Sequence, residues 1–313
     1  MSTATAVPET YELEGDDALH TLRRTGWGRL ARDAFDRFRA ADGFSHSRAL
    51  GYQFTLTALP GLIATVGLAS ALDQQTFKRV LQATLQDLAP GPASQIMSDA
   101  LQQGSEAASS SGESALIVGG IAAVLSGTLA MGQVERGANR IYGVERDRST
   151  LKKYGRGFVL ACSAGLLLLF AFLLLVAGPT IANAGKAAGG WSDSVVDLWS
   201  WVRWPVGIML VVIAFSLLFK KSPKRNQPQP SWLATGAAVA VTLFSLFTAA
   251  LAVYLTLSKS FGQTYGPLAG IIGILLWAHL ASLALYLGLA LTAQLEAVRA
   301  GVPAPSTGNE RNE

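Results

Sequence analysis

The residues best suited to chemistry in this 313-residue chain lie in one stretch, "ERGANRIYGVERDR", from Glu135 to Arg148. Three carboxylates occur there among arginines: Glu135, Glu145 and Asp147. Two or more free carboxylates could bind the metal ions of a nuclease. Carboxylates beside arginines are more simply interpreted as neutralised ion pairs, and we favour that interpretation. We therefore assign no catalytic residue and expect that the chain is not an enzyme.

Other residue types that build metal or cofactor sites are scattered. His20, His46 and His279 are far apart in the sequence, and none of them falls in a metal-binding spacing. Cys162 is the single cysteine and lies in an apolar run, which excludes a disulfide framework and a thiol-based metal site. We expect no metal and no cofactor. Because long apolar runs divide the basic residues into blocks, we also expect no nucleic-acid partner.

Long apolar segments surround the charged stretch and decide the class of protein. Half of the residues are hydrophobic and 15% are charged, against roughly 25% charged residues in ordinary globular domains. About 20 apolar residues in a helix cross the hydrocarbon core of a bilayer. Six segments qualify: residues 49–72, 114–134, 157–185, 199–219, 231–257 and 266–295. The sequence predicts an all-α, polytopic membrane protein whose six-helix domain (25–300) lies between disordered cytoplasmic tails (1–24 and 301–313).

The orientation of these spans follows from the positive charges between them. Of the 25 Lys and Arg residues, 20 fall in alternate connecting segments on one side of the membrane. Short cytoplasmic segments are rich in Lys and Arg, so both termini are predicted to be cytoplasmic. An even number of spans requires the same result. The stretch Glu135–Arg148 is thus interpreted as the point where the second span enters the cytoplasm.

Two further regions have a helical apolar period but lack the length of a span. Trp27–Phe38 has apolar residues on one face and arginines largely on the other. It is predicted to be an amphipathic helix, which either lies on the cytoplasmic membrane surface or packs against the loops of the bundle. In the first external loop, apolar stripes over Phe77–Leu88 and Ile96–Leu101 predict short amphipathic helices.

Polar residues inside a span cost free energy unless they are paired or hydrated. Tyr52, Gln53, Thr55 and Thr57 precede Pro60 in the first span. In the favoured interpretation, these side chains satisfy backbone groups that the proline leaves free. In the alternative, the proline kinks the helix and the polar side chains line a cavity.

Two more pairs of residues could line a pathway or brace neighbouring helices. Asn139 and Tyr142 are three residues apart, so they share a helix face just below the membrane, and bracing is the favoured role. Trp277 and His279 lie near the middle of the last span, where Trp277 is expected to pack within the bundle. His279 either donates to a neighbouring carbonyl as a neutral ring, which we favour, or titrates in an aqueous pathway.

Three motifs together are similar to the YihY/virulence factor BrkB family. They are "RALGYQFTLTALPGL", "RGANRIYGVERDRSTLKKYGRG" and "YGPLAGIIGILLWAHLASLALYLGLALTAQLEAVR". The resemblance covers residues 25–300 and implies a multi-pass protein of the bacterial inner membrane with undefined activity. Other members are linked to serum resistance and to export of envelope lipid, and the older label ribonuclease BN is treated as a misassignment. Where the family has Gly-Ala-Glu-Leu-Asn, this chain has Ala290 in place of the acid.

Three functions are compatible with these features. The leading hypothesis is a transporter or export factor for a lipid or another envelope amphiphile, with membrane lipids as partners. The second is a non-transporting membrane scaffold, and the third is a membrane-associated ribonuclease. Substrate, energy source and oligomeric state do not follow from the sequence.

Overall fold

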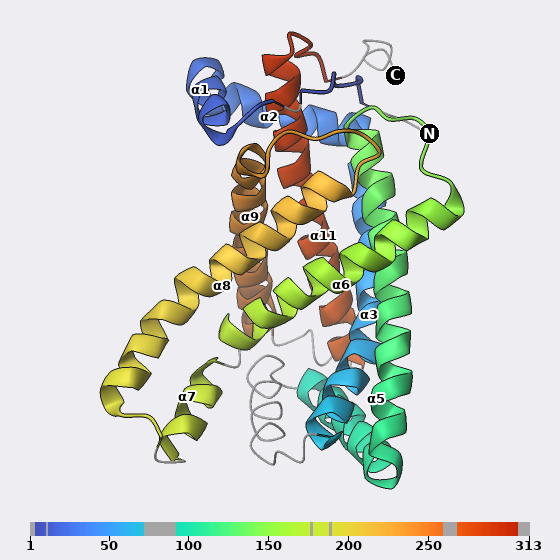
Figure 1. Ribbon diagram of the computed structural model, residues 1–313, viewed down its shortest axis with the longest axis vertical. Helices are drawn as coiled ribbons and strands as arrows, with labels where there is room; N and C mark the ends of the chain where they lie inside the picture. Colours follow the sequence, from blue (N-terminus) through green and yellow to red (C-terminus); the bar gives the residue numbers. More distant parts are fainter. Residues whose placement is uncertain are drawn as a thin grey trace.

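The computed structural model describes residues 4–10, 12–71, 92–175, 178–187, 190–258 and 268–305, and its regular structure in these ranges is entirely helical. The helices, labelled as in Figure 1, are α1 (Gly15–Thr25), α2 (Trp27–Ala40), α3 (Gly43–Ala71), α5 (Pro92–Ile141), α6 (Thr150–Leu175), α7 (Gly178–Ala187), α8 (Asp193–Lys221), α9 (Pro230–Leu257) and α11 (Ala269–Arg299). The predicted all-α class is confirmed.

Five of these helices are long and apolar enough to cross a membrane: α5 from Ile117 onward, α6, α8, α9 and α11. They fall on five of the six predicted segments, so the chain is a membrane protein with several spanning helices. α3 contains the predicted first span and is helical to Ala71, but it is not among the five. The count of six therefore stays a prediction.

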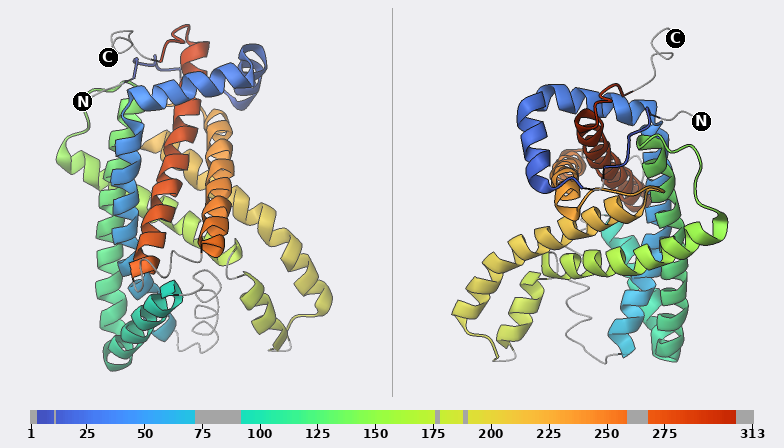
Figure 2. Two further views of the ribbon diagram at one scale, coloured as in Figure 1. Left: turned by 180° about the vertical axis from the view of Figure 1, so that it is seen from behind. Right: turned by 45° about the horizontal axis from the view of Figure 1, so that its top comes forward.

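Helix α11 is the central element of the molecule. It contacts α9, α3, α2 and α5, and the second half of the helix is almost completely buried. In Figure 1, α3, α5, α9 and α11 follow the long axis, whereas α6 and α8 pack together obliquely across them. Figure 2 shows α1 and α2 lying across the end of the bundle where both termini are found. We call this the α2 end.

Small residues bring the other helices close to α11. A Cβ on Gly236 of α9 would lie 2.7 Å from the Gly288 carbonyl oxygen and would also overlap Thr292 Oγ1. A Cβ on Gly51 of α3 would lie 2.7 Å from the His279 Cα. Without a hydrophobic driving force between helices in lipid, such close backbone packing is a main source of association.

The predicted span over residues 157–185 is wrong at its far end. The structure describes α6 as far as Leu175, and α7 is a second helix that begins at Gly178, after two residues outside the described part of the chain. Pro179 accounts for the break, because proline lacks the N–H that a helix interior needs. Backbone N–H groups in the first turn of a helix have no acceptor within the helix. A proline there costs no hydrogen bond, so Pro179 is accommodated at the start of α7.

The disordered tail predicted over residues 1–24 is wrong for Gly15 onward. These residues form α1, which starts with a capping box between Glu14 and Asp17 and packs against α9. Ala18 and Thr21 are buried in that contact. The segment is too polar to be recognised by hydropathy, but a capping box and two small buried residues are sufficient to hold a short helix.

Described residues near both ends of the chain also form backbone hydrogen bonds. The backbone N–H groups of Ala4 and Val7 donate to the carbonyls of Arg140 (3.1 Å) and Tyr142 (3.2 Å), and Thr5 N donates to the Pro305 carbonyl (3.0 Å). These main-chain contacts correct the predicted disorder for residues 4–10 and 301–305. Residues 306–313 lie outside the described part of the chain.

Helix α2 occupies the predicted amphipathic segment and packs on the bundle. Leu30, Ala34 and Phe38 are buried, and α11 is the principal neighbour of the helix. Of the two interpretations left open by the sequence, the contacts support packing within the protein. Trp27 and Phe35 nevertheless remain exposed, so part of the apolar face is free to meet lipid.

The short amphipathic helices of the first external loop are not confirmed. Phe77–Leu88 lies outside the described residues. Ile96–Leu101 is helical, but it is part of α5, which continues without interruption to Ile141.

Candidate functional site

Asp147 is the centre of an ionic cluster where the chain passes from α5 to α6. Asn139 Nδ2 donates to its Oδ1 at 2.9 Å, and Lys153 Nζ lies 3.2 Å from Oδ2. Arg136 Nε (3.6 Å) and Arg140 Nη2 (3.8 Å) complete the cluster. Burial raises the pKa of Asp147, but the hydrogen bond from Asn139 and the charge of Lys153 outweigh burial and lower that pKa overall.

Glu135 forms a buried ion pair beside this cluster. Its Oε2 lies 2.9 Å from Arg148 Nη1, and its Oε1 accepts the Arg148 backbone N–H at 3.2 Å. The ion pairs predicted for Glu135 and Asp147 are therefore confirmed, whereas Glu145 is exposed and its backbone carbonyl accepts from Arg140 (2.8 Å). A nuclease would need these carboxylates free to bind metal, and the described residues contain no group of three His, Cys, Asp or Glu side chains able to do so.

Asn139 and Tyr142 lie together at the end of α5, both almost fully buried. Asn139 Oδ1 accepts the backbone N–H of Lys224 at 2.7 Å, so this amide joins the α5–α6 turn to the α8–α9 turn. The Tyr142 ring lies under the Arg225 guanidinium, 4.6 Å from ring centroid to Cζ. Burial raises the pKa of Tyr142. These contacts support the bracing role for both residues, and the pathway-lining role stays a prediction.

A second buried polar network at the α2 end was not predicted. Arg37, counted only as an orientation marker, is fully buried in α2. Its Nε donates to Gln294 Oε1 (2.7 Å), and its Nη1 donates to the carbonyls of Thr5 (2.8 Å) and Ile141 (3.3 Å). Burial lowers the pKa of Arg37 to about 10. The available signal was its helix face, because Arg37 lies seven residues after Leu30 and three after Ala34, both of which are buried.

Glu296 forms the other half of this network, at the end of α11. Its side chain is fully buried and pairs with Arg225, whose Nη2 lies 2.7 Å from Glu296 Oε1. Thr10 Oγ1 donates to the same oxygen at 2.6 Å. Arg299, three residues further along α11, pairs with Asp17 of α1 (3.3 Å).

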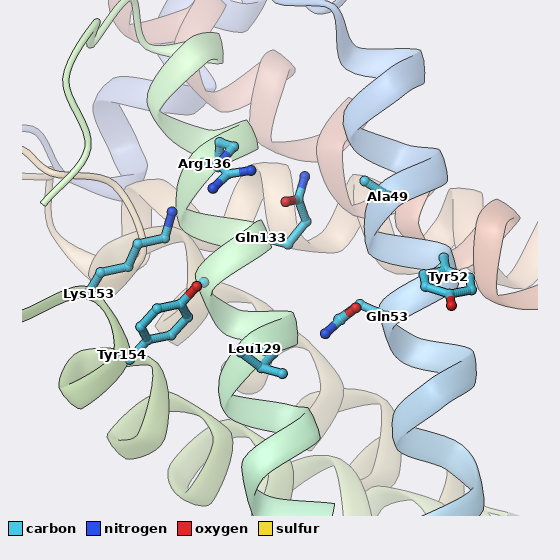
Figure 3. Close-up of a pocket in the computed structure, with 9 residues that line it drawn as sticks. Ala49, Tyr52, Gln53, Leu129, Gln133, Arg136, Lys153 and Tyr154 are labelled. Atoms are coloured by element: carbon cyan, nitrogen blue, oxygen red, sulfur yellow. The ribbon is translucent and has the colours of Figure 1, made fainter. Parts of the chain in front are cut away.

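A pocket of about 270 Å³ opens between α3, α5 and the start of α6. Figure 3 shows Tyr52 and Gln53 on α3, Gln133 and Arg136 on α5, and Lys153 and Tyr154 on α6 around the same space. Ala49, Leu129 and Gly132 complete its lining. Two of the predicted candidates, Tyr52 and Gln53, are thus brought together with basic residues distant in sequence.

The charges of this pocket are dominated by cations. Arg136 and Lys153 contribute two positive charges, and both approach the single carboxylate of Asp147, which Arg140 also contacts. One carboxylate cannot neutralise three cations, so the pocket keeps an excess of positive charge. Its chemistry suits an anionic or strongly polar group such as a phosphate.

Apolar surface continues from the pocket along the same helices. Leu56 follows Tyr52 by one helical turn, and Leu125 precedes Leu129 by one turn, so each pair shares a helix face. Leu56, Leu125 and Leu129 are all exposed. A polar pocket thus adjoins exposed apolar side chains of α3 and α5.

Pro60 and the last span lie away from this pocket. The hydroxyls of Thr55 and Thr57 donate to the Gly51 (3.0 Å) and Gln53 (2.8 Å) carbonyls. The carbonyl that Pro60 deprives of a partner is that of residue 56, four positions earlier. The hydroxyls of Thr55 and Thr57 bond to other carbonyls, so the rescue of backbone groups by Tyr52, Gln53, Thr55 and Thr57 stays a prediction.

Trp277 contacts α9, as its expected packing role requires: its Nε1 donates to Thr248 Oγ1 (3.3 Å), and its ring packs edge-on against Phe244 at 5.8 Å. His279 lies in the α3–α11 contact, and its Nδ1 has no hydrogen-bond partner in the described part of the chain. The carbonyl partner favoured for His279 is not found at that atom.

Taken together, these features define a class of protein: a helical membrane protein of several spans, with buried ion pairs at one end and a cationic pocket beside them. Comparison with known families is specific. The virulence factor BrkB family model matches residues 34–312, and this chain belongs to that family.

The names of two relatives differ: one is called ribonuclease-like, and the other is called a membrane protein. The ribonuclease-like protein YfkH of Bacillus subtilis is 27% identical over 263 residues, which cover 82% of this chain and 91% of that protein. The UPF0761 membrane protein IL2447 of Idiomarina loihiensis is 29% identical over 144 residues, covering 44% of this chain and 50% of that protein. No solved structure matches the chain significantly.

Ala290, the position at which the family motif has an acid, lies in the core. Ala290 is fully buried in α11, two residues after Gly288, which contacts α9. Thr292 donates to the Gly288 carbonyl at 3.0 Å within its own helix. The position of the family's acid is thus filled here by apolar packing.

Proposed function

We propose that this chain is a transporter or export factor of the bacterial inner membrane that moves a lipid or another envelope amphiphile. In this proposal the α2 end and both termini are cytoplasmic, as the distribution of Lys and Arg indicates. Membrane lipids are its partners.

The observation that carries the proposal is the cationic pocket between α3, α5 and α6. Arg136 and Lys153 supply positive charge, and Gln53 and Gln133 supply amide hydrogen bonds, which together suit a phosphate-bearing headgroup. One turn deeper, Leu56 and Leu125 offer apolar contact for an acyl chain. An amphiphile requires both surfaces side by side, whereas a small polar solute requires only the first.

A ribonuclease activity, which the name of one relative implies, has weaker support. The carboxylates it would need, Glu135 and Asp147, are held by four cations in ion pairs. Opening those pairs to bind metal would leave several cations uncompensated.

The proposal is tested by reconstituting the purified protein in lipid vesicles that contain a fluorescent phosphatidylglycerol. A membrane-impermeant quencher then reports how fast the label moves between leaflets. We expect faster movement than in protein-free vesicles. Equal rates with and without protein, across anionic and zwitterionic headgroups, would overturn the proposal.

A further inference from the structure

A second pocket, of about 420 Å³, lies at the α2 end between the start of α6, the end of α8 and the turn that follows α8. Its lining residues are all polar or charged: Arg156, Lys220, Lys221, Arg225, Asn226 and Gln227. None of them lines the pocket assigned to the amphiphile.

Three cations of this pocket are not neutralised by a carboxylate. Arg156 Nε donates to the Lys221 backbone carbonyl (2.9 Å), and Lys220 Nζ donates to the Pro228 carbonyl (3.0 Å). Both partners are uncharged. Lys221 is exposed, and the salt bridges found among the described residues include none of the three.

The remaining charges near the pocket are already balanced or lie at its edge. Arg225 pairs with Glu296 and so adds little net charge. The Asn226 backbone N–H (3.0 Å) and the Asn226 Nδ2 (2.9 Å) both donate to the carboxylate of Glu9. With this acid included, the pocket keeps an excess of positive charge.

Gln227 borders the pocket beside these cations. Its side chain is 5% exposed, yet neither Nε2 nor Oε1 has a hydrogen-bond partner within the described residues. Gln227 nevertheless acts on the pKa of Tyr142, which its side chain lowers against the larger effect of burial. Both amide atoms are buried, so an anion in the pocket would meet the cationic side chains and not this amide.

We infer that this pocket binds a phosphate-type anion, with Arg156, Lys220 and Lys221 supplying the charge. The two Nη atoms of Arg156 have no partner among the described residues, so they can donate to two phosphate oxygens, the geometry that guanidinium and phosphate groups favour. The anion is either a free phosphate compound or the headgroup of a lipid. The site goes beyond the proposed transport function and does not depend on it.

Its test is the binding of inorganic phosphate to the full-length protein in detergent, measured as the shift of the unfolding temperature relative to sodium chloride at equal ionic strength. Wild type should show saturable stabilisation. Lys220→Gln and Lys221→Gln, which each remove one lining cation, should each bind phosphate about tenfold more weakly. Lys152→Gln, which removes an exposed charge of α6 outside the pocket, should bind as wild type does.

A second probe, dioctanoyl phosphatidic acid as monomers, distinguishes the two sources of phosphate. Binding about tenfold tighter than phosphate, weakened by the same two variants, identifies a lipid headgroup. Binding no tighter than phosphate identifies a free phosphate compound. The inference is overturned if neither probe stabilises wild type, or if Lys221→Gln, whose side chain is exposed and whose folding is not at risk, binds both probes as tightly as wild type.

Discussion

Arg225 and Glu296, 71 residues apart, form a buried ion pair in which Nη2 lies 2.7 Å from Oε1. The two side chains are 3% and 0% exposed, and the pair fastens the α8–α9 turn to the end of α11. Each charge depends on the other, because neither has water to replace a lost partner.

Glu296→Gln should therefore destabilise the protein strongly. It leaves the Arg225 guanidinium buried without a counter-charge, which costs about 3 kcal/mol or more. Thermal and denaturant unfolding in detergent measure the loss. Arg299→Gln is the matched control, because its pair with Asp17 is about 40% exposed and should contribute about 1 kcal/mol or less. Equal effects of the two variants would contradict the buried pair.

Asn139→Ala and Tyr142→Phe should have opposite outcomes although the residues share one helix face. Asn139→Ala removes two hydrogen bonds, to Asp147 and to the Lys224 N–H, which should cost about 3 kcal/mol of unfolding free energy. Tyr142→Phe keeps the ring under Arg225 and removes a buried hydroxyl without a partner in the described structure. It should be neutral or slightly stabilising. A large loss in Tyr142→Phe would show that the hydroxyl has a partner.

Acid should weaken the cluster around Asp147. The pKa of this carboxyl is lowered in the folded protein, so its stabilising effect is complete above the unfolded pKa of about 4 and is lost as pH falls through the folded pKa. Unfolding temperatures measured from neutral pH downward should show wild type converging on Asp147→Asn below about pH 4. A constant difference between the two proteins across this range would contradict the ionic role.

Gly236→Ala should loosen the contact between α9 and α11. The added methyl group would meet the Gly288 carbonyl oxygen and Thr292, so the helices must separate. Overpacking of this kind typically costs about 1–3 kcal/mol. Gly165→Ala in α6 is the control, because a methyl group at that position would have no atom of another residue within 4 Å among the described contacts, and it should be neutral or stabilising. Similar stability of both variants would exclude tight packing at Gly236.

Much of the fold could be predicted from the sequence because hydropathy acts locally. Runs of apolar residues located the spans in α5, α6, α8, α9 and α11, and alternation of charge and apolar residues located α2. Two failures had local causes, Pro179 at the start of α7 and the capping box of α1, whereas others depended on partners distant in the chain. The burial of Arg37 requires Gln294 and Ile141, and the order of residues 4–10 requires the end of α5.

The candidate site residues also divide into those that could be recognised from the sequence and those that could not. Tyr52 and Gln53 were recognised as polar groups within a span, and the ion pairs of Glu135 and Asp147 follow from neighbours in one short stretch. The pocket could not be recognised, because it needs Arg136 and Lys153 from two other helices.

The central claim, that the cationic pocket between α3, α5 and α6 holds the headgroup of a moving amphiphile, is tested most directly by one rate. This is the initial rate of phosphatidylglycerol movement between leaflets in vesicles with the Gln53→Leu/Arg136→Gln variant, compared with wild type and Lys152→Gln. We predict that wild type and Lys152→Gln move the lipid equally fast, whereas the folded double variant is no faster than protein-free vesicles. Equal rates in wild type and the double variant would contradict the claim.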